Sequence, residues 1–155
     1  MNMDSQLGSG RDELGRVGLN ALVAQGESRF RGELAAVLSG MGLNTYLAAY
    51  GNEAVEILSS LDIHALVVDT RLPDFGGLEI VRVVRTFRTV PPFVLLADEV
   101  TSQLRAAALE SDAVSIMRNP VDTVLLSEIL DAALSRYYGR SRPAGPGSSR
   151  ARSWL

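Results

Sequence analysis

Arginine side chains gather at the carboxyl end of this 155-residue chain. Residues 136–155 contain five arginines and one tryptophan, but no acidic residue and no lysine. A guanidinium can pair with two phosphate oxygens at once, and both its flat face and an indole ring stack on aromatic surfaces. These residue types, set among proline, glycine and serine, predict a site for an anionic ligand with flat rings.

The predicted ligand residues combine guanidinium, hydroxyl and indole groups. They are Arg136, Arg140, Ser141, Arg142, Ser148, Arg150, Arg152 and Trp154. Residues two apart in an extended chain point the same way, so the even-numbered positions from Ser148 to Trp154 would share one face. Because the segment has too little apolar surface to fold alone, we expect it to be disordered until a ligand orders it.

The rest of the chain is acidic. Residues 1–135 carry ten arginines against eighteen acidic residues, a net charge of −8, whereas residues 136–155 carry +5. There is no cysteine, and neither a signal-peptide core nor a membrane-length apolar run is visible, which favours a cytoplasmic protein without a membrane partner. His64 is the only histidine, so we expect a surface or edge role for it, no metal site and no catalytic Ser/His/Asp set. We therefore expect no enzyme.

Apolar strands and amphipathic helices alternate through the middle of the chain. We predict a disordered segment over residues 1–16, one folded domain over 17–138 and a ligand-binding tail over 139–155. The expected strands cover residues 19–25, 43–50, 63–69, 92–97 and 113–117. The expected helices cover residues 28–40, 52–60, 78–88, 101–110 and 121–138. This alternation favours an α/β, doubly wound (flavodoxin-like) fold, a five-stranded parallel sheet in the order 2-1-3-4-5.

Details of these elements carry further expectations. Ser28 is placed to cap the first helix and Gly40 to end it. The last helix is expected to bury one apolar face, made of Leu126, Ile129, Leu130, Ala133 and Tyr137. Ligands of such folds bind at the carboxyl ends of the strands, which here are Gln25, Asp69, Ala97 and Arg118 with Asn119.

The stretch LVVDTRLPDFGGLE, residues 66–79, resembles the phosphoacceptor loop of CheY-like receiver domains of two-component signalling, and the resemblance covers about residues 19–138. Few of that family's functional residues are present. At the family's functional positions this chain has other residues: Gln25 and Gly26 replace the acidic pair, and Leu96 replaces the hydroxyl residue. Asn119 replaces the lysine, and Ile116 replaces the aromatic switch residue. Asp69 alone remains, and one carboxylate is a poor magnesium site. The resemblance thus implies a degenerate pseudo-receiver in which Asp69 is a vestigial phosphoacceptor and no metal is bound.

A degenerate receiver followed by an arginine-rich tail resembles the Cle group of bacterial CheY-like proteins. That resemblance implies binding of cyclic di-GMP by the tail, and docking to the flagellar motor switch in place of phosphorylation, in motility and chemotaxis. Two alternatives stay open. One is a single-domain response regulator phosphorylated on Asp69. The other is an arginine-rich arm that binds nucleic acid or an acidic protein surface, although the acidic body would repel a long polyanion.

Overall fold

The computed structural model describes residues 18–139, in which strands and helices alternate. The strands are β1 (Asn20–Ala24), β2 (Asn44–Ala48), β3 (Ala65–Asp69), β4 (Phe93–Ala97) and β5 (Ser115–Arg118). The helices are α2 (Ser28–Gly40), α3 (Gly51–Ser60), α4 (Gly77–Arg85), α5 (Ser102–Glu110) and α6 (Thr123–Tyr138). The predicted order of elements is confirmed. Within residues 18–139, no helix has both the length and the apolar character needed to cross a bilayer.

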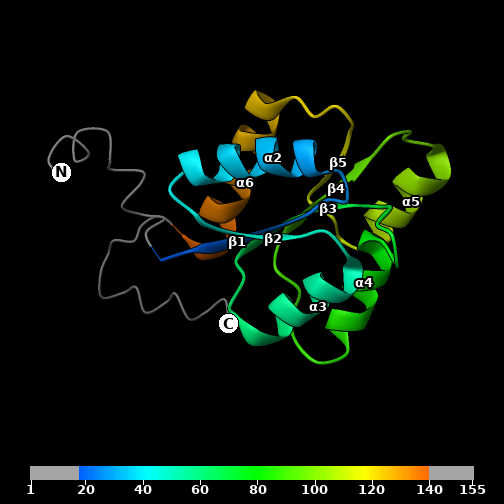
Figure 1. Cartoon of the computed structure of the whole chain (residues 1–155), viewed down its shortest axis with the longest axis horizontal. Coiled ribbons are helices and arrows are strands. Elements are labelled where there is room, and N and C mark those ends of the chain that lie inside the picture. Colours follow the sequence, from blue (N-terminus) through cyan, green and yellow to red (C-terminus); the bar gives the residue numbers. More distant parts are fainter. Residues whose placement is uncertain (1–17, 140–155) are drawn as a thin grey trace, which may run out of the picture.

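All strand pairs are parallel, and the sheet order is β2-β1-β3-β4-β5, as predicted. Figure 1 shows α2 and α6 on one face of the sheet, with α3 and α4 on the other. Parallel strands need crossover connections, which are right-handed. Because β2 lies on one side of β1 and β3 to β5 lie on the other, these crossovers place helices on both faces of the sheet. The carboxyl ends of β1, β3, β4 and β5 therefore meet along one edge of the sheet.

The core consists of two layers separated by the sheet. Alternate residues of each strand face opposite sides, so Leu22 and Leu66 pack beneath α3, α4 and α5, whereas Val23 and Val67 pack beneath α2 and α6. The central strands are buried on both faces, which explains why β3 and β4 are continuous apolar runs. Phe93, the first residue of β4, is 1% exposed.

The helix predicted over residues 28–40 is confirmed as α2, but its cap is not the predicted one. The N-cap is Glu27, whose carbonyl accepts from the Arg31 N–H (2.9 Å), and Ser28 is the first residue of the helix. The helix predicted over 78–88 ends at Arg85, three residues early. Arg88 instead turns toward α3, where it donates to the carbonyl oxygens of Leu58 and Leu61.

The buried stripe of α6 also differs from the prediction at one position. Leu126, Leu130 and Leu134 lie four residues apart and are buried, and Tyr138 continues their stripe. Tyr137, which the sequence pattern placed on this face, is 44% exposed. At about 100° per residue Tyr137 lies within the angular range of this stripe, but at the carboxyl end of the helix the ring that packs against the core and His64 is that of Tyr138.

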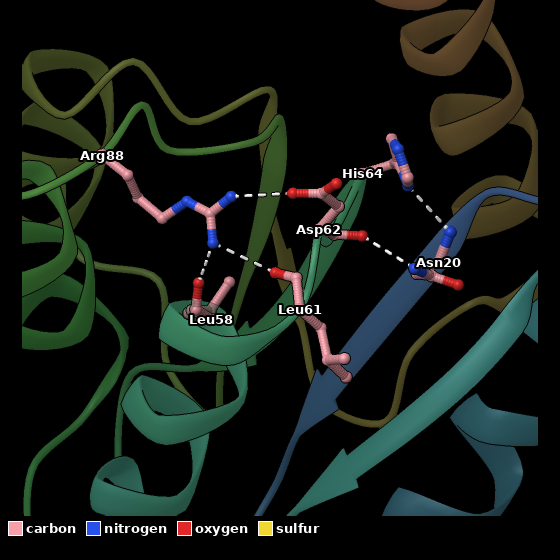
Figure 2. A network of polar contacts seen from close by, with 6 residues as sticks. All are labelled: Asn20, Leu58, Leu61, Asp62, His64 and Arg88. Atoms are coloured by element: carbon pink, nitrogen blue, oxygen red, sulfur yellow. Dashed lines mark hydrogen bonds and ion pairs between the residues drawn. The ribbon is translucent and has the colours of Figure 1, made fainter.

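A polar network joins the amino ends of β1 and β3 to the end of α3 and to Arg88 in the turn after α4 (Figure 2). Arg88 forms an ion pair with Asp62 (3.1 Å), and the Asn20 side-chain amide donates to the Asp62 carbonyl oxygen (2.8 Å). The Asn20 backbone N–H donates to Nδ1 of His64 (2.9 Å), and Tyr138 Oη donates to the His64 carbonyl oxygen (3.0 Å). His64 is thus half-buried and bonded rather than a free surface residue.

The His64 network predicts a pH dependence of stability. Burial lowers the pKa of His64 below its ordinary value of 6.5, against the attraction of the Asp62 carboxylate. The unfolded chain therefore takes up a proton more readily than the folded one, and the free energy of unfolding should fall as the pH drops through 6.5. Denaturant titrations between about pH 7.5 and about pH 5.5 should show this fall, and it should be smaller in His64→Asn. An equal fall in both proteins would contradict the prediction.

Candidate functional site

Asp69 ends β3 at the carboxyl edge of the sheet and is 6% exposed. Its Oδ2 accepts hydrogen bonds from Nε2 of Gln25 and from Nδ2 of Asn119, both at 3.0 Å. Its Oδ1 accepts from the backbone N–H of Arg71 at 2.8 Å. Three N–H donors from three loops therefore satisfy this carboxylate.

The sheet register brings these groups together. Ala24 is paired with Val68, so the residues that follow them, Gln25 and Asp69, lie side by side. Asn119 follows β5 two strands away, and its backbone N–H donates to the carbonyl of Ala97 at the end of β4 (2.8 Å). The strand-end positions expected to gather at this edge, Gln25, Asp69, Ala97 and Asn119, are thus brought together. A cis peptide bond joins Asn119 to Pro120.

The Gln25 amide is oriented by a second hydrogen bond. Its Oε1 accepts from the backbone N–H of Glu27 (3.1 Å), which leaves Nε2 to face Asp69. The Gln25 backbone carbonyl in turn accepts from Nη1 of Arg31 (2.8 Å), in the first turns of α2. Gln25 is 4% exposed, so the donor is fixed and shielded from water.

Asn119 bridges two carboxylates. Its Nδ2 donates to Asp69 Oδ2 and also to Asp98 Oδ1 (2.9 Å), in the exposed loop after β4. The site has no hydroxyl at the end of β4. Leu96, the residue to which the resemblance gave that position, is fully buried in the layer under α2 and α6, and the strand ends at Ala97.

This arrangement suits a carboxylate more than a cation. Magnesium takes several hard oxygen ligands, whereas the side chains of Gln25 and Asn119 present N–H groups to Asp69. Among residues 18–139, no group of three or more His, Cys, Asp or Glu side chains could hold a metal ion. In this site the Asp69 carboxylate accepts hydrogen bonds from two neutral side-chain amides and one backbone N–H.

Asp74 fixes the loop between β3 and α4, a role that the sequence analysis missed. Its carboxylate accepts from the backbone N–H groups of Gly51 (2.6 Å), Asn52 (2.9 Å) and Phe75 (2.7 Å), and thereby caps α3. Desolvation raises its pKa, but these hydrogen bonds outweigh that effect, so the pKa of Asp74 lies below its ordinary value. The Pro-Asp-x-Gly sequence signals a turn, but only the fold shows which helix Asp74 reaches.

The approach of this loop depends on two glycines. A Cβ on Gly76 would lie 1.8 Å from the Thr70 carbonyl oxygen, and one on Gly51 would lie 2.3 Å from the Phe75 carbonyl oxygen. Either contact would push the loop away from β3 or α3. Asp69 therefore sits under a closely packed loop.

Only one predicted ligand residue of the tail lies in the described part of the chain. Arg136 is exposed in the last turn of α6. The others lie outside the described residues: Arg140, Ser141, Arg142, Ser148, Arg150, Arg152 and Trp154.

Asp69→Asn should destabilise the fold. The new side-chain amide would place an NH₂ group, which cannot accept a hydrogen bond, where the donors from Gln25, Asn119 and Arg71 now meet a carboxylate. Hydrogen bonds to a charged group contribute about 1.5–3 kcal/mol, so we expect a loss in that range in urea denaturation. Asp98→Asn is the matched control: it removes the exposed acceptor of the same Asn119 amide and should change stability by less than about 0.5 kcal/mol. Equal losses of unfolding free energy in the two variants would show that the hydrogen bonds to Asp69 stabilise the fold no more than the exposed one to Asp98.

The chain matches known proteins over this same region. The model of the response regulator receiver domain family matches residues 21–131, well over half of the chain. Response regulator RR06 of Streptococcus pneumoniae is 33% identical over 122 residues, which cover 77% of this chain and 55% of that protein. The DNA-binding transcriptional regulator NtrC of Klebsiella pneumoniae is 23% identical over 123 residues, 79% of this chain and 26% of the relative. The chain thus spans about half or less of the length of these relatives.

Solved structures share the fold at lower identity. A CheY-like receiver domain protein of Methanospirillum hungatei superposes with a TM-score of 0.71 at 17% identity, over 76% of this chain and 94% of that one. A two-component response regulator of Clostridium difficile gives a TM-score of 0.71 at 22% identity, over 76% and 97%. With the strand order and the Asp69 loop, the matched region leads to one conclusion: this chain belongs to the response regulator receiver domain family of two-component signalling.

Proposed function

We propose that this receiver domain is a cytoplasmic effector of cyclic di-GMP that responds without phosphorylation and has no catalytic activity of its own. Ligand orders the tail after α6, and the ordered tail promotes docking to a partner, for which we propose the flagellar motor switch in motility and chemotaxis. The observation that carries the proposal is the pairing of an amide-bonded Asp69 with an arginine-rich segment directly after the last helix.

The Asp69 geometry supports a response without phosphorylation. Transfer of a phosphoryl group to a carboxylate needs a divalent cation to offset the charge that gathers on three oxygens. Here the two positions beside Asp69 that would serve the cation and the phosphate carry the amides of Gln25 and Asn119, both already bonded to Asp69. A single-domain regulator phosphorylated on Asp69 is the alternative, and it would have to break both hydrogen bonds first.

The tail supports an anionic, flat-ringed ligand. Its four arginines from Arg140 onward, with Trp154, combine phosphate pairing with base stacking, and cyclic di-GMP offers two phosphates and two guanine bases. Arginine also pairs bidentately with the O6 and N7 atoms of guanine. The acidic body disfavours a long nucleic acid, which would have to lie against it.

Docking requires an apolar surface, and α6 offers part of one. Val124 and Leu125, in the first turn of α6, are 66% and 44% exposed, although both are large apolar side chains. Leu109 on α5 is 78% exposed. Contiguous exposed apolar patches mark surfaces that bind other proteins, so we take Val124 and Leu125, which are neighbours in the chain, as part of the proposed docking surface.

Isothermal titration of the full chain with cyclic di-GMP tests the proposed function. We expect binding at about micromolar Kd or tighter. Truncation after Tyr138 should abolish it, and Trp154→Ala should weaken it about tenfold, since stacking of a base on an aromatic ring contributes about 1–3 kcal/mol. Arg150→Ala and Arg152→Ala should also weaken it, whereas Leu155→Ala, on the opposite face of an extended segment, should not.

Parallel titrations with GTP and a short RNA separate the alternatives. The proposal expects weaker binding of both than of cyclic di-GMP. Preference for RNA would favour the nucleic-acid alternative. Binding of cyclic di-GMP that survives truncation after Tyr138 would show that the tail is not the site.

A further inference from the structure

Strand β2 lies at one edge of the sheet, with β1 on its inner side and no described strand on its outer side (Figure 1). An edge strand presents unpaired backbone N–H and C=O groups, to which another strand can add. Proteins block such edges with charged side chains, proline or a bulge. The sequence of β2, NTYLA, contains no charge and no proline, and it pairs with β1 without a bulge from Asn44 to Ala48. This edge is therefore open to pairing.

The register of β1 and β2 fixes which backbone groups of β2 point inward. The Asn44 N–H donates to the Leu19 carbonyl oxygen, and the Ala48 carbonyl oxygen accepts from the Gln25 N–H, both at 3.0 Å. In a parallel pair, residues alternate between bonding to the neighbouring strand and facing away from it. The even-numbered residues of β2 thus bond to β1.

The odd-numbered residues of β2, Thr45 and Leu47, therefore direct their backbone N–H and C=O groups to the outer edge. Within residues 18–139, no loop backbone and no side chain bonds to these four groups. Two donors and two acceptors thus alternate along an uncharged edge. That pattern matches the one that an added strand would present.

Apolar side chains lie exposed beside this edge. Leu47 is 46% exposed, and Tyr50, just after the strand, is 47% exposed. Thr45 lies on the same face of the sheet as Leu47, and its Oγ1 accepts from the hydroxyl of Ser39 in α2 (3.2 Å). Tyr46 points to the other face, where it packs against the core layer beneath α3. An uncharged edge with exposed apolar side chains is a surface on which another strand can pair.

A second copy of this chain fits the edge by symmetry. If two β2 strands pair antiparallel about a two-fold axis at Tyr46, Thr45 of one copy lies opposite Leu47 of the other. Both residues have outward-pointing groups, so each such pair exchanges both N–H···O=C bonds, and the symmetry repeats the pair. The two Tyr46 side chains then face each other at a non-hydrogen-bonded position, where side chains lie closest and aromatic pairs stabilise a sheet.

The charge distribution permits this pairing although residues 1–135 carry a net charge of −8. The acid bonded at the end of β2 is Glu53, whose Oε1 accepts from the Ala49 N–H (2.7 Å). A two-fold axis at Tyr46 places the two Glu53 side chains at opposite ends of the paired strands, about 20 Å apart by the rise of a strand. That separation exceeds the Debye length of about 8 Å at physiological salt. The other edge strand, β5, carries a charge, Arg118.

We infer that two copies of this chain form a dimer through β2, which joins their two sheets into one. The outward groups of Thr45 and Leu47 make the junction, and Tyr46 lies on the axis. This inference concerns the folded domain alone, and it goes beyond the proposed function without resting on it.

Sedimentation equilibrium of the full chain without ligand tests the inference. We expect a monomer–dimer equilibrium with a Kd of about 100 μM or tighter. Leu47→Lys should raise this Kd at least about tenfold, because the symmetry introduces the change twice and brings two positive charges to one face near the axis. Gln103→Lys adds the same charge on exposed α5 and is the matched control, for which the Kd should stay within about twofold of the parent's.

The register allows a test by rescue. Thr45→Glu alone should also weaken the dimer, because it places a charge opposite Leu47. In the double variant Thr45→Glu with Leu47→Lys, the two new side chains lie opposite each other across the axis as pairs of opposite charge. The Kd should then return to within about threefold of the parent's. A double variant as weak as Leu47→Lys alone would overturn the register.

Amide hydrogen exchange gives an independent readout. On dilution from dimer to monomer, the N–H groups of Thr45 and Leu47 should exchange faster, whereas that of Tyr46, bonded to β1, should not change. A chain that stays monomeric at about 1 mM would overturn the inference. So would a dimer whose Kd is unchanged in Leu47→Lys. Thermal unfolding midpoints of the variants should match the parent's, and should Leu47→Lys fail to fold, the exchange pattern of the parent decides the matter.

Discussion

The hydrogen bonds to the Asp69 carboxylate are the constraint on which the rest of this structure depends. A carboxylate that is 6% exposed is costly to bury unless each oxygen finds a donor. In this chain the donors are the amides of Gln25 and Asn119 and the backbone N–H of Arg71. They tie the ends of β1, β3 and β5 to one another, and Asn119 extends the set to Asp98 after β4.

The same interaction bears on signalling. In a site where a cation and a positive side chain hold the carboxylate, they can balance the charge of an added phosphoryl group. The loops around the site can then change conformation when that group is added or removed. Here the neutral amides of Gln25 and Asn119 both donate to Asp69, and each makes a second hydrogen bond, to Glu27 and Asp98 respectively, which fixes the arrangement. Asp74, which binds the loop after β3 to the start of α3, fixes it further. On our proposal, the carboxyl edge of the sheet is a structural element, and the ligand acts through the segment that follows α6.

Much of the fold could be predicted from the sequence, because its signals are local or repetitive. Continuous apolar runs such as β3 and β4 indicate strands buried on both faces, and the spacing of Leu126 and Leu130 indicates one buried helix face. The strand-end position of Asp69 followed from its place after such a run. The cap placed at Ser28 instead of Glu27 was an error of a single residue at a helix end. Tyr137 was placed on the buried face, but at the end of α6 it is Tyr138 that packs on the core.

Contacts between distant segments were beyond sequence reasoning. Gln25 and Asn119 were expected at the same edge as Asp69, but that their amides both donate to one oxygen depends on side-chain direction. Asp74 reaches a helix 22 residues away, and Arg88 binds carbonyls 27 and 30 residues away. The tail residues Arg140 to Trp154 lie outside the described residues, so their role stays a prediction.

The measurement that most directly tests the central claim is intact-mass analysis after incubation with acetyl phosphate and magnesium. A variant with Gln25→Asp, Gly26→Asp and Asn119→Lys provides the positive control, since it restores the acidic pair and the lysine that the family places there. A Cβ on Gly26 would meet only the Pro73 ring at 3.5 Å, an ordinary contact, so the substitution at this position creates no clash at its Cβ. We predict no phosphoryl group on the parent chain and a gain of one in the restored variant. A phosphoryl group on the parent chain that is lost in Asp69→Asn would contradict the account.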